Sequence, residues 1–494
     1  MSKPQHPQLA AIDLGSNSFH LSIARLVQGE IQMVERIGEK IQLASSLNDD
    51  RILSDDAISR GLSCLERFAQ RLKGIPRDSI RIVGTNTLRA ARNRQQFIQA
   101  AESLLECPVE VISGREEARL IYLGVAHTHS DDQERRLVVD IGGGSTELTI
   151  GERFSPMELE SLHMGCISYS LRFFSNGQLN KQSFQRAINA AHSELLNIRS
   201  HYLRRGWNDV VGSSGTIKAA FHLLNQDKHH HPITLKFLHS LKQQLIGFDS
   251  LDKIQLRGIK DNRAAIMPGG IAILIAVFEA LEIESMSHSE GALREGLLYD
   301  QIGRRQHEDV RERTITALME RYFVDMDYAS NVETTALRCL AQTELDSNVN
   351  RELLGWSSRL HEIGLAISHS QFQKHGSYLI RHSDLVGFNQ REQQQLALLV
   401  RNHRRKMALS ELESFNPSQR LQLLSLTILL RLAIALHHSR QPEQVPDLKL
   451  NLNSGKKLTL KFPKDWLESH PLTQADLEQE AGYLKAIGVT LKFN

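Results

Sequence analysis

The spacing of apolar residues divides the chain into a first part with alternating strands and helices and a second part rich in helices. In the first part, residues 55–73 and 95–105 repeat apolar positions at helical spacing. The short apolar runs that indicate buried strands lie at residues 9–14, 80–84, 109–113 and 137–141. This alternation predicts an α/β fold in which helices pack on a sheet.

After about residue 301 the strand pattern nearly disappears. Helical patterns cover residues 353–367, 392–403 and 421–437, and one strand-like run, 456–462, follows a predicted turn at 453–455. Polar and charged residues cluster at 303–308, where we place the main boundary. The predicted regions are two α/β domains, 1–126 and 127–305, a helical domain, 306–440, and a small C-terminal region, 441–494.

One motif occurs twice in the first part. Residues 11–18 read AIDLGSNS and residues 138–145 read VVDIGGGS, so in each copy an apolar strand ends in an aspartate followed by small residues. A second alternating strand follows each turn, which predicts a β-hairpin. Two such hairpins far apart in the chain predict a duplicated domain with a cleft between its halves.

Composition adds limits on compartment. The 494-residue length suggests about three domains. The four cysteines are scattered and form no paired framework, which indicates a reducing compartment. The first eleven residues lack the apolar core of a secretory signal, and the apolar run 271–278 is too short to cross a bilayer. We therefore expect a cytoplasmic protein. The net charge of +2 is uninformative, because a polyanion would be bound by local basic clusters.

Small residues in the two repeated turns suit a phosphate ligand. Glycine lets backbone N–H groups approach an anion closely, and serine and asparagine add side-chain donors. A single such turn is ordinary hairpin chemistry, but two matching copies favour a phosphate site. The candidate phosphate-binding residues of the two turns are Asp13, Gly15, Ser16, Asn17, Ser18, Gly142, Gly143, Gly144 and Ser145.

The aspartate at each strand end and a bound phosphate both carry negative charge, so a cation is needed between them. Magnesium prefers one or two carboxylates together with phosphate and water oxygens, so we predict Mg²⁺ between Asp140 and the phosphate. Glu147 is either another ligand or the holder of a metal-bound water. A third small-residue cluster with Gly212, Ser214 and Gly215 is either an anion-binding turn at a helix start or a plain strand-to-helix connection.

The best candidate for a catalytic base lies at a helix start. Ser113 and Glu116 have capping-box spacing, which assigns Glu116 a structural role. Glu117 points to another face of the helix and can reach into the cleft to deprotonate a water, although acids in a first turn often only complement the helix dipole. Arg89 either binds a terminal phosphate with its guanidinium group or is a solvated helix residue.

The densest basic cluster lies in the helical part. It is either a docking strip for a long polyanion or a solvated helix face. Nucleic acid is not expected as a partner, because no aromatic residues are interleaved for base stacking. The cluster consists of Arg401, His403, Arg404, Arg405 and Lys406.

Together these segments resemble the exopolyphosphatase and guanosine pentaphosphate phosphohydrolase family, within the actin, sugar-kinase and heat-shock ATPase superfamily. The resemblance extends over nearly the whole chain. It rests on the motifs AIDLGSNSFHL, GTNTLR, ISGREEARLIYLGV, VVDIGGGSTEL, GSSGTIKAA, GALREGLLYD, LHEIGLAISHS, HSDLVGFNQ and LVRNHRRK.

The resemblance implies a fold and roles for single residues. It implies duplicated actin-like (ribonuclease H-like) domains, Glu117 as catalytic base, Asp140 and Glu147 near the metal and the attacking water, and the two turns as phosphate loops. The helical part resembles the HD phosphohydrolase fold. However, Glu362 instead of aspartate follows His361, so we expect no second metal centre.

Within the family we favour an exopolyphosphatase that releases orthophosphate from inorganic polyphosphate. The unbroken glycine triplet at 142–144, the GTIKAA segment and the NHRRK segment look closer to that branch. The alternative is hydrolysis of the 5′ terminal phosphate of guanosine pentaphosphate. Other rivals are a sugar or acetate kinase and a non-catalytic polyanion sensor. We also expect a homodimer, and leave open a peripheral contact with the inner membrane.

Overall fold

The structure is a computed structural model. It describes residues 7–27, 30–47, 50–128, 134–226, 231–259, 261–305, 309–440, 445–453 and 457–494, without the side chains of residues 30, 261, 262, 305 and 453. The chain forms two compact units, Met1–Glu308 (unit 1) and Asp309–Asn494 (unit 2). Parts of the predicted boundary at 303–308 and of the predicted turn at 453–455 lie outside the described residues.

The first sheet of unit 1 has the strand order β3-β2-β1-β4-β5. Strands β1 and β2 form an antiparallel hairpin, while β1, β4 and β5 run parallel. Helices α1 (Asp55–Arg71) and α3 (Arg94–Leu105) contribute Phe68 and Phe97 to the core on this sheet. The strands are β1 (Gln8–Leu14), β2 (Ser18–Val27), β3 (Glu30–Lys40), β4 (Ile80–Gly84) and β5 (Val109–Val111).

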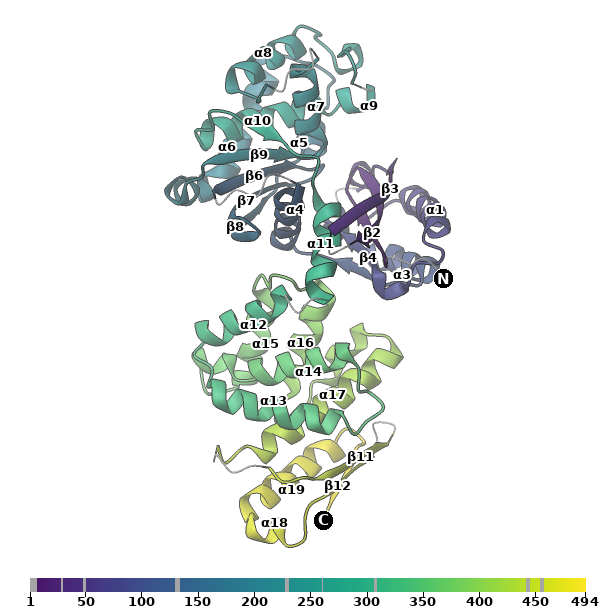
Figure 1. Ribbon diagram of the computed structural model, residues 1–494, viewed down its shortest axis with the longest axis vertical. Coiled ribbons are helices and arrows are strands. Elements are labelled where there is room, and N and C mark those ends of the chain that lie inside the picture. The colour runs from purple at the N-terminus through teal and green to yellow at the C-terminus, as the bar shows by residue number, and fades with distance from the viewer. Residues whose placement is uncertain are drawn as a thin grey trace. The chain divides into compact units, whose positions relative to one another are not determined.

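The second sheet of unit 1 repeats this arrangement in the order β10-β9-β6-β7-β8 (Figure 1). Again an antiparallel hairpin, β6 and β7, is followed by parallel strands, β9 and β10. The internal repeat therefore corresponds to a duplicated α/β domain, and the predicted fold class is confirmed. The strands are β6 (Arg135–Ile141), β7 (Thr146–Glu152), β8 (Ser155–Leu162), β9 (Asp209–Ser213) and β10 (Ser287–His288).

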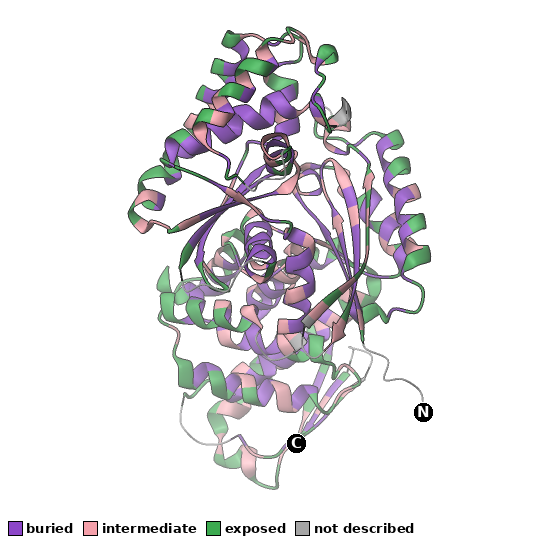
Figure 2. Ribbon diagram, turned by 45° about the horizontal axis from the view of Figure 1, so that its top comes forward, coloured by how far each residue is buried: buried purple, intermediate pink, exposed green. Residues whose placement is uncertain are grey.

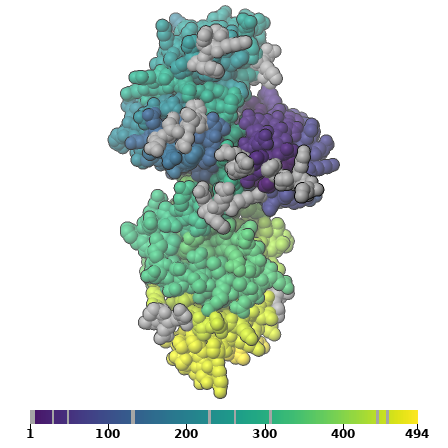
Figure 3. Space-filling view, in the orientation of Figure 1, coloured from purple at the N-terminus to yellow at the C-terminus, as the bar shows by residue number. Residues whose placement is uncertain are grey.

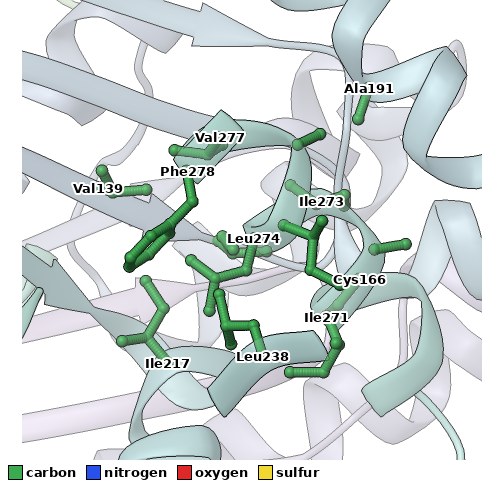
Figure 4. Close-up of a cluster of buried hydrophobic side chains, with 14 of the residues drawn as sticks. Val139, Cys166, Ala191, Ile217, Leu238, Ile271, Ile273, Leu274, Val277 and Phe278 are labelled. Carbon is green, nitrogen blue, oxygen red and sulfur yellow. The ribbon is translucent and has the colours of Figure 1, made fainter. Parts of the chain in front are cut away.

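Helix α10 (Met267–Ala280) forms the centre of the core beside the second sheet. It packs against α5 (Cys166–Phe173), α6 (Lys181–Arg205) and α8 (Leu235–Ile246), and Figure 4 shows its apolar side chains among those of its neighbours. A helix that is apolar all round must be buried on every side, which explains its sequence MPGGIAILIAVFEA. By contrast, Figure 2 shows that the outer helices of unit 1 are buried on one face and exposed on the other.

Helices α4 (Gly114–Thr128) and α11 (Leu293–Arg305) cross with their backbones in contact (Figure 1). A Cβ atom on Gly296 would collide with the carbonyl oxygen of Leu120 on α4, and one on Gly124 with that of Ala292, just before α11, so only glycine permits this approach. A buried ion cluster reinforces the crossing. Asp300 on α11 accepts hydrogen bonds from Arg119 on α4 (2.6 Å), from Arg81 on β4 (2.5 Å) and from Arg304 (2.8 Å).

Unit 2 is mainly helical, with a three-stranded sheet near the C-terminus, whose residues appear yellow in Figure 3. Its sheet has the order β11-β12-β13 and packs with α19 (Pro471–Lys485). The helices before the sheet are α12 (Val310–Arg321), α13 (Met326–Leu340), α14 (Asn348–Leu360), α15 (Phe372–His382), α16 (Gln390–Asn402) and α17 (Pro417–Leu436). The strands are β11 (Lys449–Asn453), β12 (Lys457–Lys461) and β13 (Thr490–Phe493).

Helix α17 is more apolar than the sequence pattern indicated. Among the described residues it is the one helix long and apolar enough to cross a membrane. However, its side chains form much of the core of unit 2, and Arg431 in its C-terminal half is buried against Glu480. The helix is therefore explained as the core helix of a globular unit.

Most predicted elements differ from the observed ones by a few residues at their ends. The run 109–113 ends as a strand at Val111, because Ser113 already caps the next helix. The helix predicted at 353–367 ends at Leu360 and is followed by a short 3₁₀ helix, Ile363–Ala366. Strands β3, β8, β10, β11 and β13 were missed.

Candidate active site

The two repeated turns face one cavity of about 360 Å³ in unit 1. One turn joins β1 to β2, and the other joins β6 to β7. They lie close together, since a Cβ atom built on Gly143 would be 3.2 Å from the Cβ atom of Ser16. Ser16 in turn accepts a hydrogen bond from Thr87 (2.9 Å), which fixes its hydroxyl beside β4.

Most of the predicted site residues of unit 1 line this cavity. The exceptions are Arg89, Glu147 and Gly212, whose surroundings are described below. The predicted residues that line it are Asp13, Gly15, Ser16, Asn17, Ser18, Glu117, Asp140, Gly142, Gly143, Gly144, Ser145, Ser214 and Gly215.

Glu117 reaches the cavity from the first turn of α4. Its buried carboxylate accepts a hydrogen bond from Arg89 (2.7 Å), which also donates to the carbonyl oxygen of Ile112 (3.0 Å). Arg89 is not part of the cavity wall, so a direct role in gripping phosphate does not match its position. The contacts make Arg89 a positioning residue for Glu117.

Glu116, the neighbour of Glu117, faces the protein interior. Its backbone N–H donates to the Ser113 hydroxyl (3.2 Å), as the capping spacing predicted. Its carboxylate binds Arg119 through two hydrogen bonds of 2.8 Å, and Arg119 connects it to Asp300. This ion cluster holds the start of α4 in place, and the next residue, Glu117, points from another face of the helix toward the cavity.

Three carboxylates lie close to one another and to Glu117: Asp140 and Glu147 are buried, and Asp13 is half-buried. Burial, reinforced by the charge of Glu117, raises the pKa of both Asp13 and Asp140 to about 7. The same two causes raise the pKa of Glu147 well above its usual value. In addition, Oδ1 of Asp13 has no hydrogen-bond partner among the described residues. Buried acids that lack partners require either protons or a cation.

Glu147 follows the second turn on β7, opposite Asp140 on β6, and is not among the residues that line the cavity. Its Oε1 accepts a hydrogen bond from Ser161 (2.8 Å), and its side chain is almost fully buried. The predicted contact between Glu147 and a ligand is therefore not direct in this structure. Its charge still acts on the site, since Asp140 and Glu117 both contribute to its raised pKa.

The third small-residue cluster also reaches the cavity, at the start of α7 (Ser214–Leu224). Ser214 adopts a left-handed backbone (φ +74°), a conformation unusual outside glycine and frequent at ligand sites. Its hydroxyl donates to the carbonyl oxygen of Ile141 (2.8 Å). Gly212 is different: it lies within β9, where a Cβ atom would collide with Ile217 and Met286, so its role is packing.

Three cations line the cavity that the sequence analysis did not single out: Lys218, Arg263 and Arg294. Lys218 binds Glu290 (2.6 Å), and Arg294 approaches Nδ1 of His20 (3.5 Å). Gly215 leaves room for Arg263, because a Cβ atom there would lie 2.6 Å from the guanidinium carbon. Lys218 lies in the motif GSSGTIKAA and Arg294 in the motif GALREGLLYD. Arg263 lies in no motif, so the sequence offered no reason to place it in the cavity.

Comparisons with known proteins agree with this geometry. The description "Ppx/GppA phosphatase family" matches residues 22–305, and "Ppx/GppA phosphatase, domain III" matches residues 310–481. The chain belongs to the Ppx/GppA phosphatase family. It is therefore a hydrolase of that family, as the motifs implied.

Two relatives and one solved structure give the extent of the likeness. A Vibrio vulnificus protein named guanosine-5′-triphosphate,3′-diphosphate pyrophosphatase is 42% identical over 98% of this chain and 97% of its own length. A Photobacterium profundum protein of the same name is 41% identical over 97% and 96%. An exopolyphosphatase structure from Cytophaga hutchinsonii shares the fold, with a TM-score of 0.55 and 23% identity over 60% of this chain and 97% of that one.

In domain III of the family, the predicted docking strip is not one continuous surface. His403, Arg404 and Arg405 line a cavity of their own, whereas Arg401 and Lys406 do not. His403 is buried rather than solvated, and Arg401 lies 3.7 Å from Glu411. A strip would require the helix to continue through these residues. However, α16 ends at Asn402, after which the chain turns.

Proposed function

We propose that this member of the Ppx/GppA phosphatase family hydrolyses the 5′ terminal phosphate of guanosine pentaphosphate and releases orthophosphate. The names of the two bacterial relatives support this choice over polyphosphate. The structural observation that carries it is a recess of about 360 Å³ that shares Asn86, Gly143 and Gly144 with the cavity.

The recess offers an apolar surface, which the sugar and base of a nucleoside can contact and a bare phosphate chain cannot use. Its walls include the apolar side chains of Leu47, Ile167 and Leu171, and Arg172 adds a cation at its edge. Leu171 is 55% exposed, so its side chain is accessible to a ligand that enters the recess. A nucleotide with its terminal phosphate between the turns would have its sugar and base within reach of these walls.

Hydrolysis requires a water, a base and stabilisation of the transferred phosphoryl group. Glu117, held by Arg89, would take a proton from the water as the water oxygen bonds to the terminal phosphorus. The bond from that phosphorus to the bridging oxygen then breaks, and guanosine tetraphosphate leaves. Backbone N–H groups of the two turns, together with Arg263 and Arg294, would stabilise the charge that develops on the phosphoryl oxygens.

The residues present suit a magnesium ion beside Asp140. The donors are hard carboxylate oxygens, the acids are buried with raised pKa values, and Asp13 has an oxygen without a partner among the described residues. Asp140 and Asp13 would hold the ion, and its positive charge would offset that of the phosphate. Within the described residues no three His, Cys, Asp or Glu side chains form a metal-binding group, so phosphate and water oxygens would supply the other ligands.

Release of phosphate from inorganic polyphosphate is the second candidate, and the sequence motifs favoured it. The cavity supports it to the extent that Lys218, Arg263 and Arg294 provide cations for a linear anion. Both substrates would use the same base and the same turns. They differ in their need for the apolar recess.

The test is orthophosphate release from guanosine pentaphosphate and from long polyphosphate, each in excess magnesium and with no acceptor added. We expect the larger kcat/KM for the nucleotide. The matched control is Glu117→Gln, which should abolish release from both. Faster turnover of polyphosphate, with no measurable release from the nucleotide, would contradict the proposal. A requirement for an acceptor would indicate a kinase, and binding without any release would indicate a sensor.

A further inference from the structure

Unit 2 contains a cavity of about 700 Å³, larger than the cavity of unit 1. It lies among the ends of α14, α16 and α17, with α15 and α19 beside it. No step of the proposed hydrolysis uses it. Its walls combine two buried histidines, several arginines and aromatic rings, which are described in turn below.

Two histidines, His361 and His403, face the cavity in almost full burial, with 1% and 2% of their surfaces exposed. Their rings lie 5.3 Å apart, centre to centre. The Nδ1–H group of each donates to a backbone carbonyl oxygen, of Ser358 and Val400 respectively, at 2.7 Å. Since a carbonyl only accepts, Nε2 of each ring carries the lone pair, and neither Nε2 has a partner among the described residues. Two unsatisfied buried atoms in one cavity call for a ligand.

The charges in the cavity wall leave an excess of arginine. Each carboxylate is already paired: Glu362 with Arg440, Glu480 with Arg431, and Asp476 with His438. In contrast, Arg404 and Arg405 have no carboxylate within ion-pair distance in the part of the chain that the structure describes. Burial and the charge of Arg405 lower the pKa of Arg404, as expected for a cation that lacks a counterion. The free charge in this cavity is therefore positive.

The turn that carries these arginines is firmly held. Arg431 donates to the carbonyl oxygen of Asn402 (2.7 Å), and the Asn402 side chain accepts from the backbone of Ala408 (2.7 Å). Arg404 stacks on Phe372, with 4.5 Å from guanidinium carbon to ring centre. Arg405 has a left-handed backbone (φ +57°), a strain found at ligand-binding positions. Both guanidinium groups are thus presented to the cavity before any ligand arrives.

The apolar part of the wall decides between kinds of anion. Tyr328, Phe372 and Ile434 line the cavity beside the arginines. A linear phosphate chain has no surface that could use them, but the ring system of a nucleotide does. A metal ion is disfavoured, because within the described residues no third ligand completes a metal-binding group and the nearest free charges are positive.

We propose that this cavity binds a phosphorylated nucleotide, with its phosphates against Arg404 and Arg405 and its ring system against the aromatic wall. Phosphate in this position would also draw a proton onto Nε2 of His361 or His403, which converts each atom into a donor toward the anion. The site would bind without reaction. It is separate from the residues of the proposed hydrolysis and does not depend on that proposal.

The test uses the full chain and measures protection from hydrogen exchange in residues 359–365 and 400–408. The probes are guanosine tetraphosphate, GTP, tripolyphosphate and Zn²⁺. We expect the nucleotides to protect both segments, and the double variant Arg404→Ala/Arg405→Ala to weaken binding at least about tenfold. The matched control is Arg401→Ala/Lys406→Ala, which removes two neighbouring cations that do not line the cavity and should leave the nucleotide affinity unchanged.

A second variant separates binding from folding. Arg405→Gly removes one guanidinium group and relieves the left-handed backbone, so it should weaken nucleotide binding while the melting temperature stays level or rises. The proposal is overturned if the control pair weakens binding as much as the cavity pair, or if no probe protects the segments. It is also overturned if tripolyphosphate binds as tightly as the nucleotides, or if only Zn²⁺ binds. Hydrogen exchange needs no turnover, whereas the proposed hydrolysis is tested by orthophosphate release. Failure of one proposal is therefore distinguishable from failure of the other.

Discussion

Both cavities contain acids and bases in their walls, but they differ in which enclosed groups crowd together: carboxylates in unit 1, and histidines beside arginines in unit 2. In unit 1, Asp13, Glu117 and Asp140 crowd together, and burial raises the pKa of the two aspartates to about 7. In unit 2, arginines surround His361 and His403, and burial lowers the pKa of His361 to about 4. We therefore propose a cation as well as phosphate for the first cavity, and an anion alone for the second. If both proposals hold, acids belong to a phosphate site only where hydrolysis follows binding.

The largest effect should come from Glu117→Gln. Loss of the base should lower turnover by about a hundredfold to ten-thousandfold, while the substrate is still bound. The measurement is orthophosphate release under saturating substrate, with the exposed Glu152→Gln as the matched control. If Glu117→Gln retained full turnover, unit 1 would use its acids only for binding, and the contrast with unit 2 would disappear.

Arg89→Ala should have the next largest effect. Without this partner the Glu117 carboxylate loses its orientation, and a misplaced catalytic group costs about a hundredfold in rate. Because Arg89 does not line the cavity, kcat should fall with little change in KM, and Arg89→Lys should recover part of the loss. A rise in KM at constant kcat would instead assign Arg89 to substrate binding.

The stabilities of the two units should respond to pH in opposite directions. In unit 1 the folded pKa values of Asp13 and Asp140 are raised from 3.8 to about 7, so stability is full below about pH 4 and is lost as the pH rises through 7. A tenfold difference in proton affinity between the folded and unfolded states corresponds to about 1.4 kcal/mol. Scanning calorimetry in chelator should therefore show unit 1 melting earlier at pH 8 than at pH 6. Magnesium should reverse this loss, and Asp13→Asn should flatten the dependence.

Unit 2 should behave in the opposite way. The folded pKa of His361 is lowered from 6.5 to about 4, and burial also lowers that of His403, so stability is full above pH 6.5 and is lost as the pH falls toward 4. Arg404, Arg431 and Arg440 oppose protonation of the two histidines, and the acids in the same cavity wall are Glu362, Asp476 and Glu480. If both calorimetric transitions moved in the same direction with pH, the contrast between the cavities would be refuted.

The smallest effect should distinguish the two substrates. Leu171→Asp places a charge in the apolar recess beside the unit 1 cavity, and should raise KM for guanosine pentaphosphate about tenfold. Polyphosphate turnover should be unaffected, since that chain needs no apolar contact. Leu196→Asp, at another exposed leucine on α6, is the matched control. An equal change for both substrates would remove the recess from nucleotide recognition.

Local sequence signals predicted the parts of the site that neighbouring residues determine. The twin hairpins followed from two copies of one motif, and the direction of Glu117 followed from the cap formed by Ser113 and Glu116. Residues brought together only by tertiary folding were missed. Arg263 reaches the cavity because Gly215 leaves space for it, a fact that no spacing along the chain encodes.

Burial was the other weak point of the sequence analysis. His403 belonged to a basic run that suggested a solvated strip, yet the end of α16 turns it into the core and turns Arg405 toward the cavity. Similarly, Glu147 follows the second turn in sequence but is buried and outside the cavity wall, where Ser161 on β8 donates a hydrogen bond to its carboxylate. Hydrophobic periodicity identifies which face of an element is apolar, and polar residues at its ends are not constrained in this way.

The crossing of α4 and α11 fixes the position of Glu117 at the unit 1 cavity. Two main chains touch at Gly124 and Gly296, with no side chain between them. A larger residue at either position would push the two segments apart, because its Cβ atom would meet backbone atoms of the other segment. Glu117 lies about two helical turns from Gly124, so a shift of α4 would move its carboxylate relative to the two small-residue turns. Two residues without side chains thus determine where this carboxylate lies.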